Sequence, residues 1–165
     1  VVRPKNPQES GAQAGRYRED PALFRSRLQA GLTAMKAFAQ TEAAKTAAMG
    51  YCFGGGGVLE LARAGADVNG VISFHGSIAP RNPEGGKNIK GKVLVVHAAQ
   101  DPTVPRAALS AFMDERQSAN IDYQLVVYNL NAHAFTVPGS ASYSPDADRP
   151  SWPELRRLLA ELFGA

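Results

Sequence analysis

Residues 50–54, Gly-Tyr-Cys-Phe-Gly, form a G-x-nucleophile-x-G pattern with Cys52 where serine is commoner. The pattern is typical of a tight turn between a strand and a helix, in which a side chain at either flanking glycine should collide with neighbouring backbone. The turn would place Cys52 at a helix N-terminus, whose partial positive charge lowers the pKa of a thiol and stabilises an oxyanion. The backbone N–H of Phe53 would be one donor to that oxyanion. The alternative is a glycine-rich turn beside a buried cysteine that only packs.

Two polar residues further along the chain could complete a catalytic triad with Cys52. Asp101 follows the apolar run 92–98, and His133 follows the run 122–128. The chain order nucleophile, acid, histidine is that of α/β-hydrolases, which place each partner in a loop after a later strand. His133 would accept the thiol proton, and Asp101 would hold the imidazole in the productive tautomer. The alternatives are an ordinary turn beginning at Asp101 and a solvated loop histidine.

The other two histidines also lie near predicted strand ends. His75 precedes Gly76 and could line the pocket, although a hydrogen-bonded structural role is favoured. His97 lies four residues before Asp101 on the same segment, too near in the chain for that carboxylate to orient it from across a cleft. We therefore predict that His133 is the base.

Apolar patterns predict the elements that must position these residues. Strands are expected in the apolar runs at 46–49, 71–74, 92–98 and 122–128. Helices are expected at about 23–40, from Val58 onward, at 105–118 and from Ser151 onward. Ser151 and Glu154 have the spacing of a capping box, so the last helix should begin there. Segments 1–22 and 138–150 are rich in proline and polar residues and are expected to be loops, the first with at most a short helix.

Strands that alternate with helices predict an α/β fold. The strands are continuous apolar runs, which is typical of a mostly parallel sheet covered by helices on both faces. The chain has 165 residues, enough for one domain with a hydrophobic core. We therefore expect a single domain over 1–165.

Composition excludes several classes of protein. Apolar residues make up 44% and charged residues 20%, which excludes collagen-like, coiled-coil and wholly disordered chains. A single cysteine excludes a disulfide scaffold and a cysteine-rich zinc site. No apolar run approaches the ~20 residues of a membrane span. The net charge of +3 is spread along the chain, so no nucleic-acid or membrane partner is expected.

Four motifs, in this order, resemble the dienelactone hydrolase family. They are GYCFGG at 50–55, Phe74-His75-Gly76, VLVVHAAQDP at 93–102 and His133-Ala134-Phe135, and the resemblance extends from about Arg3 to Phe163. The family consists of cysteine-dependent α/β-hydrolases that open lactones and cleave activated esters. The resemblance implies an α/β-hydrolase fold and a triad of Cys52, Asp101 and His133. It also implies a small ester or lactone as substrate, with no cofactor and no metal.

The sequence departs from the family pattern in three places. The strands that precede the first helix in family members, with a second oxyanion donor and a glutamate that engages the resting cysteine, have no counterpart here. We therefore expect the C-terminal portion of the fold. Ala134 and Val137 stand where the best-known members have a serine and an arginine that helps hold the substrate carboxylate. Arg16, Tyr17 and Arg18 lie where members carry a further substrate-binding arginine and a tyrosine, without a residue-by-residue match.

Few features of the sequence bear on the cellular compartment or the oligomeric state of the protein. The chain begins Val1-Val2-Arg3-Pro4, without methionine or a signal-peptide pattern, so an N-terminal part is expected to be missing. The absence of disulfides makes the cytoplasm the default compartment. The expected assembly is a monomer or homodimer. The alternative to an ester hydrolase is a non-catalytic hydrolase-like module that binds a small molecule or senses oxidants through Cys52.

Overall fold

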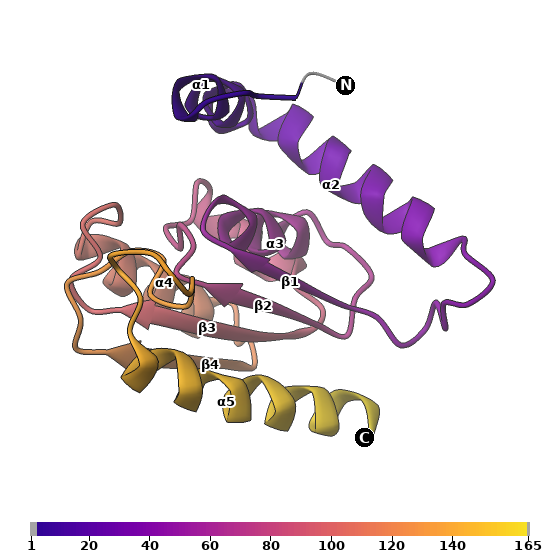
Figure 1. The fold of residues 1–165 in the computed structure, drawn as a ribbon. Helices are drawn as coiled ribbons and strands as arrows, with labels where there is room; N and C mark the ends of the chain where they lie inside the picture. Colours follow the sequence, from indigo (N-terminus) through magenta and orange to yellow (C-terminus); the bar gives the residue numbers. More distant parts are fainter. Residues whose placement is uncertain (1–2, 165) are drawn as a thin grey trace.

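Four parallel strands form the centre of the molecule in the computed structural model, which describes residues 3–164 (Figure 1). They are β1 (Ala47–Tyr51), β2 (Gly70–Phe74), β3 (Lys92–Ala98) and β4 (Tyr123–Tyr128), in the order β1-β2-β3-β4. Each lies within two residues of its predicted bounds, and the parallel sheet is confirmed. Because all four strands run in one direction, their carboxyl ends meet at one edge, where Cys52, His75 and Asp101 follow.

Helices cover both faces of this sheet. Successive strand residues point to opposite faces, so Val93 and Val95 pack with residues of α2 (Pro21–Lys36), α3 (Phe53–Arg63) and α4 (Ala107–Ser118). Leu94 and Val96 pack on the other face with α5 (Pro145–Phe163). A short 3₁₀ helix, η1 (Pro83–Asn88), precedes β3. The predicted α/β class is confirmed. None of the helices within residues 3–164 is both long enough and apolar enough to cross a bilayer.

The N-terminal segment differs from the prediction. The sequence predicts a loop with at most a short helix over 1–22, but the 13 residues Pro7–Glu19 form the helix α1. Residues 1 and 2 lie outside the described part of the chain. Asn6 caps this helix by accepting a hydrogen bond from the N–H of Glu9 at 2.8 Å, and Pro7 supplies a suitable φ in the first turn. No residue of α1 is buried, so the helix has no apolar stripe that would reveal it in the sequence.

The last helix begins earlier than predicted. α5 starts at Pro145 rather than at Ser151, whose hydroxyl donates to the backbone oxygen of Asp148 inside the helix. Asp146 and Asp148 lie in the first turn, where negative charge is favourable, and Pro145 suits the first helical position. The predicted loop over 138–150 is therefore confirmed only as far as Ser144, and the capping box at Ser151 is wrong.

Candidate active site

Cys52 lies alone in the turn between β1 and α3. β1 ends at Tyr51 and α3 begins at Phe53, and Cys52 between them has φ 49° and ψ −118°, a strained conformation for a residue with a side chain. A Cβ atom on Gly50 would lie 2.2 Å from the backbone oxygen of Gly54, which confirms the predicted steric need for glycine at position 50. A Cβ atom on Gly54 would meet nothing within 4 Å, so the same prediction is wrong for Gly54.

The second glycine of the turn at which a side chain would clash is Gly55, the residue after Gly54. A Cβ atom there would lie 2.8 Å from Ser73 Oγ and 2.9 Å from Gly76 Cα, because the first turn of α3 packs directly against the end of β2. A Cβ atom on Gly76 would in turn lie 2.5 Å from the carbonyl carbon of Gly55. Backbone packing therefore fixes the position of Cys52 relative to β2.

Phe53 is the first residue of α3. The N–H groups in the first turn of a helix have no acceptor within the helix, so the N–H of Phe53 is available to a ligand oxygen. The Phe53 ring packs against those of Phe24 and Tyr17, with centroids 4.9 and 6.4 Å away, which joins the turn to α2 and α1. The role of this N–H in stabilising an oxyanion stays a prediction.

Asp101 and His133, the predicted partners of Cys52, lie in contact. His133 Nδ1 is 2.8 Å from Asp101 Oδ2. The backbone N–H and the hydroxyl of Thr103 donate to the other carboxylate oxygen at 2.8 and 2.7 Å, and the hydroxyl contact is not predicted from the sequence. Burial raises the pKa of Asp101, but the hydrogen bonds from His133 and Thr103 outweigh it and hold this pKa below its ordinary value. Because the ionised carboxylate only accepts, His133 donates through Nδ1, and Nε2 carries the lone pair of the ring.

The Cys52 thiol contacts His75. Sγ lies 3.4 Å from His75 Nδ1, which also accepts the backbone N–H of Cys52 at 3.2 Å. His75 Nε2 is 2.8 Å from the hydroxyl oxygen of Thr136. Because Nδ1 accepts from a backbone N–H, the ring proton is on Nε2, and the thiol donates to the Nδ1 lone pair. His75 is fully buried and hydrogen-bonded, which fits the structural role favoured from the sequence, but its contact with the candidate nucleophile was not predicted.

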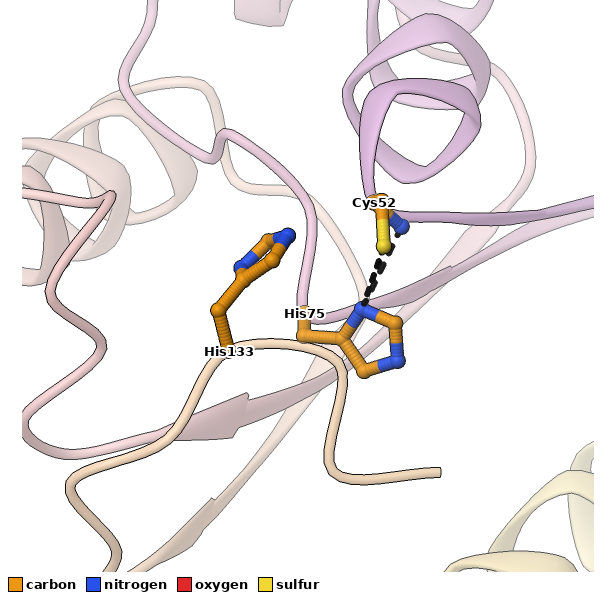
Figure 2. A group of neighbouring side chains, drawn as sticks. All are labelled: Cys52, His75 and His133. Atoms are coloured by element: carbon orange, nitrogen blue, oxygen red, sulfur yellow. Dashed lines mark hydrogen bonds between the residues drawn. The ribbon is translucent and has the colours of Figure 1, made fainter. Parts of the chain in front are cut away.

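Cys52, His75 and His133 form one cluster (Figure 2). Sγ of Cys52 and one ring nitrogen of each histidine all lie within 4.8 Å of one another. Cys52 and His133 face a pocket of about 500 Å³, whose wall also includes Arg18 and Arg81. A pocket of this volume accommodates a small organic molecule.

The acidity of the Cys52 thiol differs from the prediction. Burial raises the pKa of this thiol above its ordinary value, and the Asp101 carboxylate raises it further. This direction is opposite to the lowering expected from the helix N-terminus. The thiol is therefore protonated at neutral pH, and attack by its sulfur requires a base.

Folding stability is expected to fall between pH 6.5 and about pH 4 because of His75. Burial, reinforced by nearby His133, lowers the pKa of His75 from 6.5 to about 4. In this window the unfolded chain binds a proton that the folded protein does not, so the free energy of unfolding should decrease by about 3 kcal/mol as the pH is lowered. Urea unfolding across this range should show the decrease, and a smaller one in His75→Gln. Equal decreases in both proteins would contradict the assignment to His75.

Comparison with known proteins supplies the family. A model of the dienelactone hydrolase family matches residues 3–163. The chain belongs to the dienelactone hydrolase family. Its relatives include the Caenorhabditis elegans protein K02A2.1, which is 30% identical over 149 residues, covering 85% of this chain and 94% of that protein. The carboxymethylenebutenolidase homolog of Mus musculus is 29% identical over 123 residues, covering 74% of this chain and 49% of that protein.

Solved structures share the fold of this dienelactone hydrolase family member. The structure of m3DLH matches with a TM-score of 0.89 and 35% identity over 97% of this chain. The dienelactone hydrolase-like promiscuous phosphotriesterase P91, from metagenomic libraries, matches with a TM-score of 0.85 and 36% identity over 92% of this chain. The chain spans 70% and 66% of these two proteins and about half (49%) of the mouse relative.

The residues that the sequence analysis singled out as departures from the family pattern do not all lie at the pocket. Ala134, next to His133, has a left-handed φ of 59°, and Val137 is 41% exposed; neither belongs to the described pocket wall. Arg18, on α1, does line the pocket, and its backbone oxygen accepts a hydrogen bond from the guanidinium of Arg81. No sequence signal pointed to Arg81, which lies in a loop distant from Cys52 in the chain.

Proposed function

We propose that this protein hydrolyses small activated carboxylic esters or lactones through a thioester on Cys52. The observation that carries the proposal is the cluster at the strand ends, where a thiol on a strained turn lies beside a histidine held by an ionised carboxylate. Membership of the dienelactone hydrolase family and the carboxymethylenebutenolidase relatives support this class of reaction. Cys52, His133 and Asp101 act as nucleophile, base and orienting acid.

The reaction begins when the Cys52 thiol turns from His75 toward His133, whose Nε2 takes its proton. The thiolate adds to the substrate carbonyl, and the N–H of Phe53 stabilises the oxyanion. When this intermediate collapses, the bond to the leaving oxygen breaks and His133 returns the proton to that oxygen. Water deprotonated by His133 then adds to the thioester, and collapse expels the thiol of Cys52 and releases the carboxylic acid.

The cysteine nucleophile restricts the leaving group. A tetrahedral intermediate expels a thiolate more readily than a poor alkoxide or an amide nitrogen. When the substrate has a poor leaving group, most of the intermediate therefore returns to free thiol and intact substrate. An activated enol ester or lactone has a leaving group good enough to compete with the thiolate. A peptide does not, so the proposed substrates are esters and lactones.

Arg18 and Arg81 favour substrates that carry a negative charge. Both residues line the pocket. Among the described residues of the pocket wall, Glu60 supplies a carboxylate, but it is already paired with Arg25 and Arg63 at 2.9 and 3.0 Å. The charge of Arg18 and Arg81 is therefore left for a substrate anion, which a guanidinium binds through charge-assisted hydrogen bonds.

Arg18→Gln is expected to raise KM for a carboxylate-bearing ester by about 10-fold, which corresponds to one hydrogen bond to a charged group. KM for a neutral ester of the same size should change little. Arg16→Gln is the matched control, because Arg16 is exposed on the same helix and lies outside the described pocket wall. Steady-state kinetics with both esters measure the effect. Equal increases in KM for the two esters would mean that Arg18 acts through the placement of α1 and not through charge.

The reaction itself is tested by turnover of a chromogenic short-chain ester, with the acyl-enzyme captured in the same reaction. Intact-mass measurement after an acid quench should show one acyl group per chain, absent in Cys52→Ala. Iodoacetamide should add one group to the single cysteine and abolish turnover. Full turnover after stoichiometric labelling of Cys52 would overturn the proposal. No turnover of any activated ester would point instead to the non-catalytic alternative.

A further inference from the structure

His75 has no part in the proposed reaction, yet it is fully buried against the nucleophile. Its Nε2–H donates to Thr136, which leaves the Nδ1 lone pair facing Cys52. His133 is arranged in the same way, because its Nδ1–H donates to Asp101 and its Nε2 lone pair is free. Two imidazole lone pairs and one sulfur atom therefore meet beside the pocket (Figure 2).

This arrangement has the features of a zinc site. Metal-binding histidines donate their second ring N–H to a carboxylate or another acceptor that fixes the ring, as Asp101 and Thr136 do here. Thiolate and imidazole suit Zn²⁺, whereas Mg²⁺ and Ca²⁺ prefer oxygen ligands. In a tetrahedral site with Zn–S of about 2.3 Å and Zn–N of about 2.0 Å, sulfur and nitrogen are about 3.5 Å apart. Cys52 Sγ and His75 Nδ1 are already 3.4 Å apart.

The cluster can close on a metal ion without disturbing the fold. The three donor atoms lie within 4.8 Å of one another, so only small movements are needed to bring them to one ion, and the His133 side chain, at 28% exposed, is not tightly enclosed. If a metal takes the Nδ1 lone pair of His75, the backbone N–H of Cys52 keeps its hydrogen bond to the carbonyl oxygen of Phe74 at 3.1 Å. Since Cys52 and His133 line the pocket, a fourth ligand position would open to it, where water can complete a tetrahedron.

We propose that Cys52, His75 and His133 bind one Zn²⁺ ion and that this ion stops ester hydrolysis reversibly. As the Zn–S bond forms, the thiol proton passes to solvent. The ion then occupies both the nucleophilic sulfur and the lone pair of the base, so it is an inhibitor and not a cofactor. Binding rests on the geometry of the cluster alone, whereas inhibition also rests on the proposed function.

The experiment is a titration of the metal-free chain with Zn²⁺, followed by competition with a chromophoric chelator and, in parallel, by ester turnover. The wild-type chain should bind one Zn²⁺ and lose turnover in proportion, and excess chelator should restore it. Thr136→Val, which removes only the partner of the His75 ring, should weaken Zn²⁺ binding by about 10–100-fold. His75→Ala removes a ligand, so it should weaken binding by more than about 100-fold.

The matched control is His97→Gln, because His97 is the remaining histidine and lies outside the cluster. Its affinity for Zn²⁺ should equal that of the wild type. Co²⁺ in place of Zn²⁺ should give a thiolate-to-metal charge-transfer band that Cys52→Ala removes.

Three outcomes separate this site from its alternatives. Equal affinity for Zn²⁺ in the wild type, His75→Ala and Thr136→Val would overturn the three-ligand site, and Thr136→Val decides this alone if His75→Ala does not fold. Undiminished turnover in the zinc-loaded chain would overturn the inhibition. Zinc binding as described in a chain that hydrolyses no activated ester would refute the proposed function and leave the zinc site standing.

Discussion

Cys52→Ala is expected to lower kcat for ester hydrolysis by about 10⁶-fold, the effect of removing the nucleophile from a comparable hydrolytic triad. No other thiol of the chain can replace it, since Cys52 is the single cysteine. Cys52→Ser should keep the shape of the turn and still lose most of the activity, because His133 must then deprotonate a far weaker acid. Single-turnover and steady-state kinetics with one chromogenic ester measure both variants.

The two cysteine variants also control for each other. Both should retain the circular dichroism spectrum of the wild type, because the strained turn depends on Gly50 and Gly55 and not on the sulfur. Unchanged kcat/KM in Cys52→Ser would contradict the importance of thiol acidity. Turnover by Cys52→Ala near that of the wild type would show that the nucleophile is another residue.

Asp101→Asn is expected to lower kcat by about 10⁴-fold, with a much smaller change in KM. Asp101 Oδ2 accepts from His133 Nδ1 at 2.8 Å, which keeps the ring proton on that nitrogen. An asparagine amide that donates to Nδ1 favours the opposite tautomer, in which Nε2 carries the proton and cannot accept the proton of Cys52. Steady-state kinetics against pH should show the loss at every pH at which the wild type is active.

Thr103→Val is the matched control for Asp101→Asn. It removes one hydroxyl, which donates to Asp101 at 2.7 Å and lies 3.0 Å from His133 Nδ1, and it leaves the carboxylate and its contact with His133 in place. The expected loss in kcat is about 10-fold, the value of one hydrogen bond to a charged group. If Asp101→Asn changed only KM, Asp101 would be a substrate-binding residue and not the group that orients His133.

The strands and the turn could be predicted because each depends on a local pattern. β3 is an unbroken apolar run since both of its faces are buried, and its predicted bounds, 92–98, are those observed. Gly50 is required by a clash within the turn itself. Asp101 and His133 could be placed together because parallel strands bring their carboxyl ends to one edge of the sheet.

Other features of the site depend on contacts between distant segments. The register of β1 and β2 places Tyr51 opposite Phe74, so the next residues, Cys52 and His75, lie side by side. Neither strand has an alternating pattern from which that register could be read. Thr103 and Thr136 hold the two imidazole rings through hydroxyl groups, which occur in many loops without such a role. The direction of the Cys52 pKa shift depends on burial, which only the assembled fold determines.

The close approach of Gly55 and Gly76 indicates which positions of this protein tolerate substitution and which do not. A side chain at either glycine would collide with backbone, so random mutagenesis should return almost no active variants at these positions. α1 contributes Arg18 to the pocket wall and has no buried residue, so its sequence can drift without loss of core packing. Directed evolution toward new esters should therefore accumulate changes on α1 and around Arg81, while Cys52, His133 and Asp101 stay unchanged.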